Sequence, residues 1–359
     1  MVSATNVGDL SRDVPGIDPA RVTSWVVEHV PGLVAPLDLT RVGEGQSNLT
    51  YRVRDAAGGT VVLRRPPTGD ILPSAHDVAR EYRVLTGLAS QGMPVPRPLA
   101  LCDDPDVTGA VFYVMEHVDG LVLNTLNTAE QLSESARAET GKSLVRTLAR
   151  LQTTDLEASG LSELRRPGTY ADRQLRRWRR QWDASKTREL PLVDELADRL
   201  AASAPEEAEV TIVHGDFHPL NLILGRDGEV RAVVDWELCT VGDPLADVGL
   251  LVAYWNELGA AAGRAGALFR EPVTAVAGFP SGAELAAEYA RASGRDLAEL
   301  GFWIAFAYWK VAIIVEGVYR RWLNDPGNGS GAGELQPAVG RLAGLARAAL
   351  DSDPLTVTA

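Results

Sequence analysis

The chain has 359 residues, of which 45% are hydrophobic and 23% charged, a composition that is ordinary for a globular enzyme. Chains longer than about 250–300 residues usually divide into domains or lobes, so we expect more than one here. The formal net charge of −13 argues against a nucleic-acid-binding protein, which would carry a basic patch. Cys102 and Cys239 are too few for a disulfide framework or a metal cluster, and the N-terminus has no secretory pattern, so we expect a cytoplasmic location.

The first part of the chain is predicted to be small and rich in strands. A helix should begin after Asp18, the N-cap, with Pro19 as its first residue. The elements expected after it are a β-hairpin formed by residues 49–55 and 60–66, a helix over residues 74–92 and a strand within residues 109–120.

The rest of the chain is predicted to be mainly helical, with two short apolar strands inside residues 210–237. A further helix should follow, with Asp243 as its N-cap. Residues 301–322 have the length of a membrane span, but Lys310 lies in the middle, where a charge costs about 2.5–3.5 kcal/mol in a bilayer. We therefore expect a buried helix and no membrane partner, in an α+β protein with two parts.

Polar residues gather around the two short strands, in the sequence VHGDFHPLNLILGRDGEVRAVVDWE (residues 213–237). Asp216 follows the first strand, Asn221 comes five residues later, and Asp235 ends the next strand. A hairpin across the intervening GRDGEV would bring Asp235 back beside Asn221. Carboxylate and amide oxygens of this kind suit Mg²⁺, which takes its other ligands from water and phosphate.

His214 and His218 are four residues apart, an interval that also occurs in zinc sites. However, they flank a turn rather than lie on a helix, and no glutamate follows His214. We therefore predict that His214 braces the loop by hydrogen bonds.

The pattern His-Gly-Asp-x-x-x-x-Asn, followed by a strand-terminal Asp, resembles the catalytic loop of the protein-kinase superfamily. Gly215 and the Asp-Trp-Glu motif at Asp235 resemble the aminoglycoside phosphotransferase family. The stretches VLRRPP, REYRVL and VVDWELCTVGDPLADVG resemble its branch linked to acyl-CoA dehydrogenases. The resemblance implies a bilobal protein-kinase-like α+β fold, with a β-rich N-lobe at 1–115, a hinge at 116–120, a helical C-lobe at 121–350 and a flexible tail at 351–359.

This resemblance implies an ATP-dependent kinase that transfers the γ-phosphoryl group to a hydroxyl of a small molecule. Asp216 would be the catalytic residue that orients the hydroxyl, and Asn221 and Asp235 would hold Mg²⁺. The acceptor stays open between a hydroxyacyl-CoA and an aminoglycoside, and the oligomeric state is not indicated. The alternative is a nucleotide-binding pseudokinase that acts as an interaction module. A protein kinase is disfavoured because no Ala-Pro-Glu motif follows Asp235.

The resemblance also implies which residues bind ATP between the lobes. Alternation along the strand 60–65 places Val62 and Arg64 on one face, and Leu63 and Arg65 on the other. Val62 would cover the adenine, and Arg64, where lysine is usual, would reach the phosphates with Glu81 as its partner. Arg65 is the alternative. The other expected nucleotide contacts are Gly43, Gly45, Ser47 and Asn48 in a glycine-rich loop, which lacks the third glycine, and Met115, Glu116 and Val118 in the hinge.

Residues 163–188 form a basic stretch in this acidic chain, and Arg173, Arg176, Arg177 and Arg180 share one helical face. The face is either a solvated surface or a docking strip for an anionic acceptor such as a CoA thioester. Asp247 is expected to anchor the catalytic loop from below, and the role of Glu237 stays open between a magnesium-site group and a substrate contact.

Overall fold

The computed structural model describes residues 14–42, 48–67, 77–255, 273–325 and 335–352. The chain divides into two compact units, Met1–Val118 and Asp119–Ala359. The boundary between them falls inside the segment 116–120 that the sequence predicts as a hinge.

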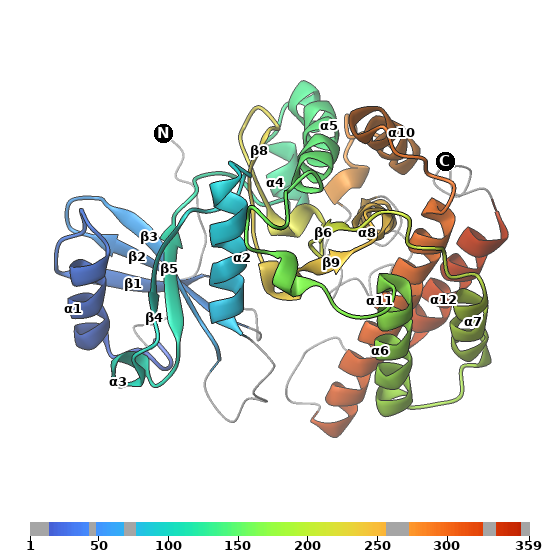
Figure 1. Ribbon diagram of the computed structural model, residues 1–359, viewed down its shortest axis with the longest axis horizontal. Helices are drawn as coiled ribbons and strands as arrows, with labels where there is room; N and C mark the ends of the chain where they lie inside the picture. The colour runs from blue at the N-terminus through green and yellow to red at the C-terminus, as the bar shows by residue number, and fades with distance from the viewer. Residues whose placement is uncertain (1–13, 43–47, 68–76, 256–272, 326–334, 353–359) are drawn as a thin grey trace. The chain divides into compact units, whose positions relative to one another are not determined.

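The first unit is built on a five-stranded sheet in which all neighbouring strands are antiparallel (Figure 1). The strands are β1 (Leu37–Val42), β2 (Leu49–Asp55), β3 (Thr60–Arg65), β4 (Pro98–Cys102) and β5 (Phe112–Glu116), in the spatial order β1-β2-β3-β5-β4. The sequence predicts the β2–β3 hairpin and β5, but it misses β1 and β4. The segment of β4 is rich in proline, which is more typical of turns than of strands, but Pro98 is tolerated because it is the first residue of an edge strand.

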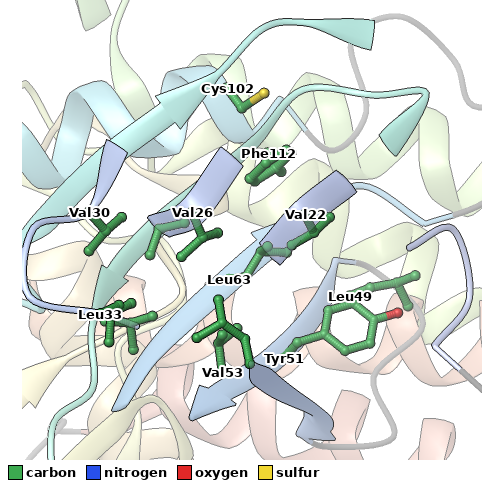
Figure 2. Packing of buried hydrophobic residues seen from close by; sticks show 13 residues of the cluster. Val22, Val26, Val30, Leu33, Leu49, Tyr51, Val53, Leu63, Cys102 and Phe112 are labelled. Atoms are coloured by element: carbon green, nitrogen blue, oxygen red, sulfur yellow. The ribbon is translucent and has the colours of Figure 1, made fainter. Parts of the chain in front are cut away.

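One face of this sheet is closed by α1 (Pro19–His29), with α3 (Pro105–Thr108) beside it. Asp18 caps α1 as predicted, because its side chain accepts the N–H groups of Ala20 and Arg21. Figure 2 shows Val22 and Val26 of this helix beside Leu63 and the other apolar side chains of the sheet. The alternate residues of β3 therefore lie on the opposite face, next to α2 (Val78–Ser90).

The second unit is mainly helical. Its helices are α4 (Leu126–Glu130), α5 (Glu134–Leu151), α6 (Tyr170–Ser185), α7 (Pro191–Ala202), α8 (Leu245–Trp255), α10 (Gly282–Ser293), α11 (Leu300–Asn324) and α12 (Gln336–Asp351). Among them lie two antiparallel strand pairs, β6 (Thr211–Val213) with β9 (Thr240–Gly242) and β7 (Leu222–Leu224) with β8 (Val230–Val233). The functional candidates of this unit lie in the turns at the ends of these four strands.

Helix α11 is the apolar segment whose length matches a membrane span. It passes that test by length and composition, but 89% of its most apolar stretch is buried inside the structure, against α8 and α12 among others. Glu316 is fully buried and forms an ion pair with Arg188 (2.8 Å). The prediction of a buried core helix is confirmed, and its two buried charges, Lys310 and Glu316, have partners within the fold.

Candidate active site

The loop that leaves β6 is braced by His214. The Nδ1 atom of His214 accepts the backbone N–H of Asp216 (3.2 Å), and its Nε2 lies 3.0 Å from the carbonyl oxygen of Val234. Since Nδ1 accepts, the hydrogen-bond network places the proton on Nε2, which then donates to Val234. The ring also packs against Trp236, with 4.5 Å between ring centroids. The predicted bracing role of His214 is confirmed.

Gly215 adopts a conformation that requires glycine. Its φ is +84°, and a Cβ atom there would lie 2.9 Å from the carbonyl oxygen of Leu238. Below the loop, Asp247 accepts the N–H groups of His214 (2.7 Å) and Gly215 (2.9 Å), as predicted. Burial raises the pKa of Asp247, although His214 and the two amides oppose that shift.

The carboxylate of Asp216 is oriented by two donors that bind the same oxygen. His218 Nε2 lies 3.2 Å and Asn221 Nδ2 lies 3.1 Å from Oδ2. In the part of the chain that the structure describes, Oδ1 accepts no hydrogen bond, and the side chain is 31% exposed. The loop therefore fixes one oxygen of Asp216 and presents the other to a ligand.

The surroundings of Asp216 also determine its protonation state. Burial by itself would raise the pKa of this carboxyl, but the hydrogen bond and charge of His218, with Lys310 and His214, outweigh it. The pKa of Asp216 consequently lies far below its usual range. The group remains a carboxylate at neutral pH, suited to orient a hydroxyl rather than to act as a strong base.

The predicted hairpin that returns the chain to Asn221 is present. Strands β7 and β8 pair with Leu222 opposite Val233, and the N–H of Val234 donates to the carbonyl of Asn221 (2.9 Å). This places Asp235, the next residue, beside Asn221. The Nδ2 of Asn221 is used by Asp216, so its side-chain oxygen is left as an acceptor.

Asp235 is the only non-glycine residue with a positive φ (66°) among the described residues. Such a conformation is uncommon for residues with a Cβ, and it is concentrated at functional sites. No group of three or more His, Cys, Asp or Glu side chains forms a potential metal site within the described ranges. An amide oxygen from Asn221 and a carboxylate from Asp235 nevertheless fit Mg²⁺, which keeps waters and binds substrate phosphates.

In the first unit, the strand alternation predicted for β3 is confirmed. Val61, Leu63 and Arg65 are buried in the α1 face, whereas Val62 and Arg64 lie on the other face. The Nε of Arg64 donates to Glu81 of α2 at 2.9 Å. Both side chains are largely shielded, with 12% and 2% exposed, so the predicted pair is a fixed feature of this face.

Arg65 has a different environment, and the alternative that placed it at the nucleotide is wrong. Its guanidinium donates to the carbonyl oxygens of Gly16, Thr108 (3.2 Å) and Pro66 (3.1 Å). Only 3% of the residue is exposed, and burial lowers its pKa. Arg65 therefore ties the segments around α1 and α3 to the sheet.

The predicted adenine contacts lie at the end of β5. Met115 pairs directly with Val62, so the two side chains are neighbours on one face. The N–H of Glu116 is used by the carbonyl of Arg97 (2.8 Å), whereas the N–H of Val118 has no backbone acceptor among the described residues. In the predicted adenine contacts, the N–H of Val118 would therefore be the donor, and the carbonyl group of Glu116 would be the acceptor.

The remaining predicted residues are those of the glycine-rich loop and Glu237. Gly43, Gly45 and Ser47 lie outside the described residues, and Asn48 is buried immediately before β2. Glu237 lies partly exposed in the turn after Asp235 and keeps its open role.

The arginines on the basic face of α6 differ in their surroundings. Arg173 donates to the carbonyls of Arg166, Gly168 and Val241, which is a structural role. Arg176 and Arg180 line a groove of about 490 Å³ between α6 and α7.

Of two further residues near the loop, Lys310 has a role that was not predicted, whereas Asp243 has the predicted capping role. Lys310 donates to the carbonyl of Gly215 (2.9 Å), which the sequence could not indicate because the two residues are far apart in the chain. Asp243, which caps α8 through the N–H of Leu245 (2.8 Å), has its pKa raised by burial to about 6.

A five-stranded sheet carrying a buried Arg–Glu pair, followed by a helical unit with an Asp-Asn loop and a strand-terminal Asp, defines the class of kinase-like phosphotransferases. The sequence profile of the phosphotransferase enzyme family (APH) matches residues 38–303. The chain belongs to this family.

Known relatives agree with this assignment. Acyl-CoA dehydrogenase family member 10 of Mus musculus is 34% identical over 350 residues, which are 93% of this chain and 32% of that protein. A solved structure from Ralstonia eutropha, described as a candidate aminoglycoside phosphotransferase, is 30% identical, has a TM-score of 0.76, and covers 92% of this chain and 98% of its own. The chain thus spans about a third of the length of the mouse relative.

A third similarity concerns the fold alone. The aminoglycoside phosphotransferase APH(4)-Ia, solved with AMP-PNP and hygromycin B, is 18% identical with a TM-score of 0.60, and covers 92% of this chain and 99% of its own. The predicted kinase-like α+β fold is confirmed.

Proposed function

We propose that this protein is an ATP- and Mg²⁺-dependent kinase that phosphorylates a hydroxyl of a small molecule. The observation that carries the proposal is the one-sided hydrogen bonding of Asp216. His218 and Asn221 fix Oδ2, and Oδ1 accepts no hydrogen bond among the described residues and belongs to a partly exposed side chain. A carboxylate held in this way is arranged to accept a hydrogen bond from an alcohol.

Each residue then has a defined task. Asp216 Oδ1 accepts the hydroxyl proton in a hydrogen bond and aims the alcohol oxygen at the γ-phosphorus. The depressed pKa means that Asp216 takes the proton only late, as the new P–O bond forms and the bond from the γ-phosphorus to the leaving ADP breaks. Arg64, whose side chain is held by Glu81, would bind the phosphates of ATP with a charge that does not titrate. Asn221 and Asp235 would hold Mg²⁺, which when bound neutralises phosphate charge.

Nucleotide use is supported by relatives of the same fold. APH(4)-Ia was solved with the ATP analogue AMP-PNP. The intact set of Asp216, Asn221 and Asp235 favours an active enzyme over the pseudokinase alternative. The cytoplasmic location expected from the sequence belongs to the same proposal, because ATP and Mg²⁺ are abundant there.

For the acceptor we propose an anionic hydroxyacyl thioester. The support is the similarity to an acyl-CoA dehydrogenase family member and the open arginines of α6. Arg176 and Arg180 are exposed and, within the described ranges, neither is paired with a carboxylate. The net charge of −13 would favour a cationic aminoglycoside, but charges beyond about 8 Å are screened at physiological salt, so the local arginines should decide.

The test is a panel of hydroxyacyl-CoAs, aminoglycosides, aminoalcohols and sugars, with ADP release as the readout. The double variant Arg176→Glu/Arg180→Glu should raise the KM of the thioester about tenfold or more and leave the KM of ATP unchanged. A matched control, Lys142→Glu/Arg347→Glu, reverses two exposed charges on α5 and α12 and should change neither constant. Turnover of aminoglycosides alone, with a KM that falls in the α6 variant, would overturn the acceptor proposal.

A further inference from the structure

The peptide group that precedes Asp216 is bound by two side chains. The N–H of this group is the one that donates to His214 Nδ1, and its carbonyl belongs to Gly215. That carbonyl accepts a hydrogen bond from Lys310 Nζ of α11 at 2.9 Å. The peptide group between Gly215 and Asp216 is therefore held at both its N–H and its C=O ends.

Lys310 is the only buried lysine among the residues that the structure describes, with 8% of the residue exposed. Its ammonium lies 5.6 Å from the ring centroid of Trp178 on α6, within cation–π range. The charges of Asp216 and Asp247 favour the ammonium, although burial lowers the pKa of Lys310 on balance. Burying an ammonium group costs free energy, so a buried lysine needs a specific contact that stabilises its charge.

The surroundings leave little room for another role. A cavity of about 10 Å³, roughly the size of one water molecule, lies among Lys310, Asp247, Tyr170 and the Gly215 backbone. This is too small for a substrate or a nucleotide. Lys310 consequently acts on the loop from behind, without contact with the reacting groups.

We propose that Lys310 is a positioning residue for phosphoryl transfer: by holding the Gly215 carbonyl, it fixes the peptide group that aims Asp216 at the acceptor. Asp247 ties the two preceding peptide groups through the N–H groups of His214 and Gly215. Three consecutive peptide groups are thus each bound to a side chain of α8 or α11. The proposal rests on the kinase activity proposed above.

The test compares wild-type protein with Lys310→Met, which has a similar length and no donor. We expect kcat to fall about 10- to 100-fold, the scale of a lost charged hydrogen bond, while the KM of Mg-ATP stays within about twofold. Lys310→Arg keeps charge and donors and should recover much of the lost kcat. The control Lys142→Met removes an exposed ammonium on α5 and should behave like wild type.

A second readout does not require turnover. Hydrogen exchange of residues 214–221 should become about tenfold faster in Lys310→Met, with the rest of the second unit unchanged. If Lys310→Met does not fold, Lys310→Gln, which keeps a shorter neutral donor, replaces it in both measurements. A wild-type protein without any turnover would refute the proposed kinase activity, but the exchange result would still test the contact.

Wild-type kcat and unchanged exchange in Lys310→Met would overturn the proposal. So would a uniform rise in exchange throughout the second unit, with kcat and KM lost together, because that result would indicate a merely structural lysine.

Discussion

The two neighbouring arginines of β3 should respond to mutation in opposite ways. Arg64 lies on the face with Glu81, and Arg65 is buried on the face of α1 with three backbone carbonyls as acceptors. Replacing Arg65 by alanine removes all three hydrogen bonds and the packing of a side chain that is itself buried. At about 1–2 kcal/mol for each hydrogen bond, this should cost roughly 3–6 kcal/mol of folding free energy.

Arg64→Ala should instead act mainly on catalysis. The loss of a phosphate-binding charge should reduce kcat/KM for ATP by about 10²–10³, which corresponds to roughly 3–4 kcal/mol. Stability should fall by a smaller amount, about 1.5–3 kcal/mol, because the 2%-exposed carboxylate of Glu81 loses its hydrogen bond from Arg64. Arg64→Lys should keep substantial activity, since an ammonium still supplies a point charge.

Urea unfolding and steady-state kinetics on the same preparations separate the two effects. The double variant Arg64→Ala/Glu81→Gln also removes the buried negative charge of Glu81, so it should recover stability without recovering activity. The reasoning would be refuted if Arg65→Ala lost more activity than stability, or if the double variant regained activity.

Three further predictions concern the second unit. Asp235→Asn should weaken Mg-ATP binding at least tenfold with little effect on metal-free nucleotide, as measured by calorimetry; equal losses with and without metal would contradict a metal role. His218→Phe should lower kcat about tenfold at unchanged KM for ATP, because Asp216 Oδ2 keeps only Asn221; a changed KM alone would argue against this. Asp243 has a folded-state pKa raised to about 6, so the stability that its neutral form contributes is present below about pH 4 and is lost as the pH rises through 6. Asp243→Asn should therefore be more stable than wild type by about 1–3 kcal/mol at pH 8 and similar to it at pH 4, and a difference that does not vary with pH would exclude this origin.

Much of the site could be predicted because it depends on local periodicity. Alternation along β3 separates Arg64 from Arg65, and the short turn between β7 and β8 returns Asp235 to Asn221. Both features follow from a strand geometry that is fixed over a few residues. The functional interpretation rests on the polar residues at the strand ends, because burying a polar side chain costs free energy unless it has a partner or a function.

The features that were missed depend on contacts between distant segments. The contact of Lys310 with Gly215 joins residues 95 positions apart, and periodicity within α11 indicates only that Lys310 is buried. The same applies to Arg173, which the sequence left open between a solvated surface and an anion-docking strip, whereas its guanidinium binds the carbonyl of Val241. Strand β4 was missed because a proline-rich edge strand resembles a turn in sequence.

The most direct test of the kinase assignment is the comparison of wild-type protein with Asp216→Asn at saturating Mg-ATP and acceptor, with ADP release for turnover and calorimetry for nucleotide affinity. Asparagine keeps the size of the side chain but removes its negative charge. The account predicts that kcat falls at least about 10³-fold while the Kd of Mg-ATP changes less than about threefold, because Asp216 orients the acceptor and does not hold the nucleotide. Equal turnover by the two proteins, or a loss explained entirely by weaker ATP binding, would contradict it.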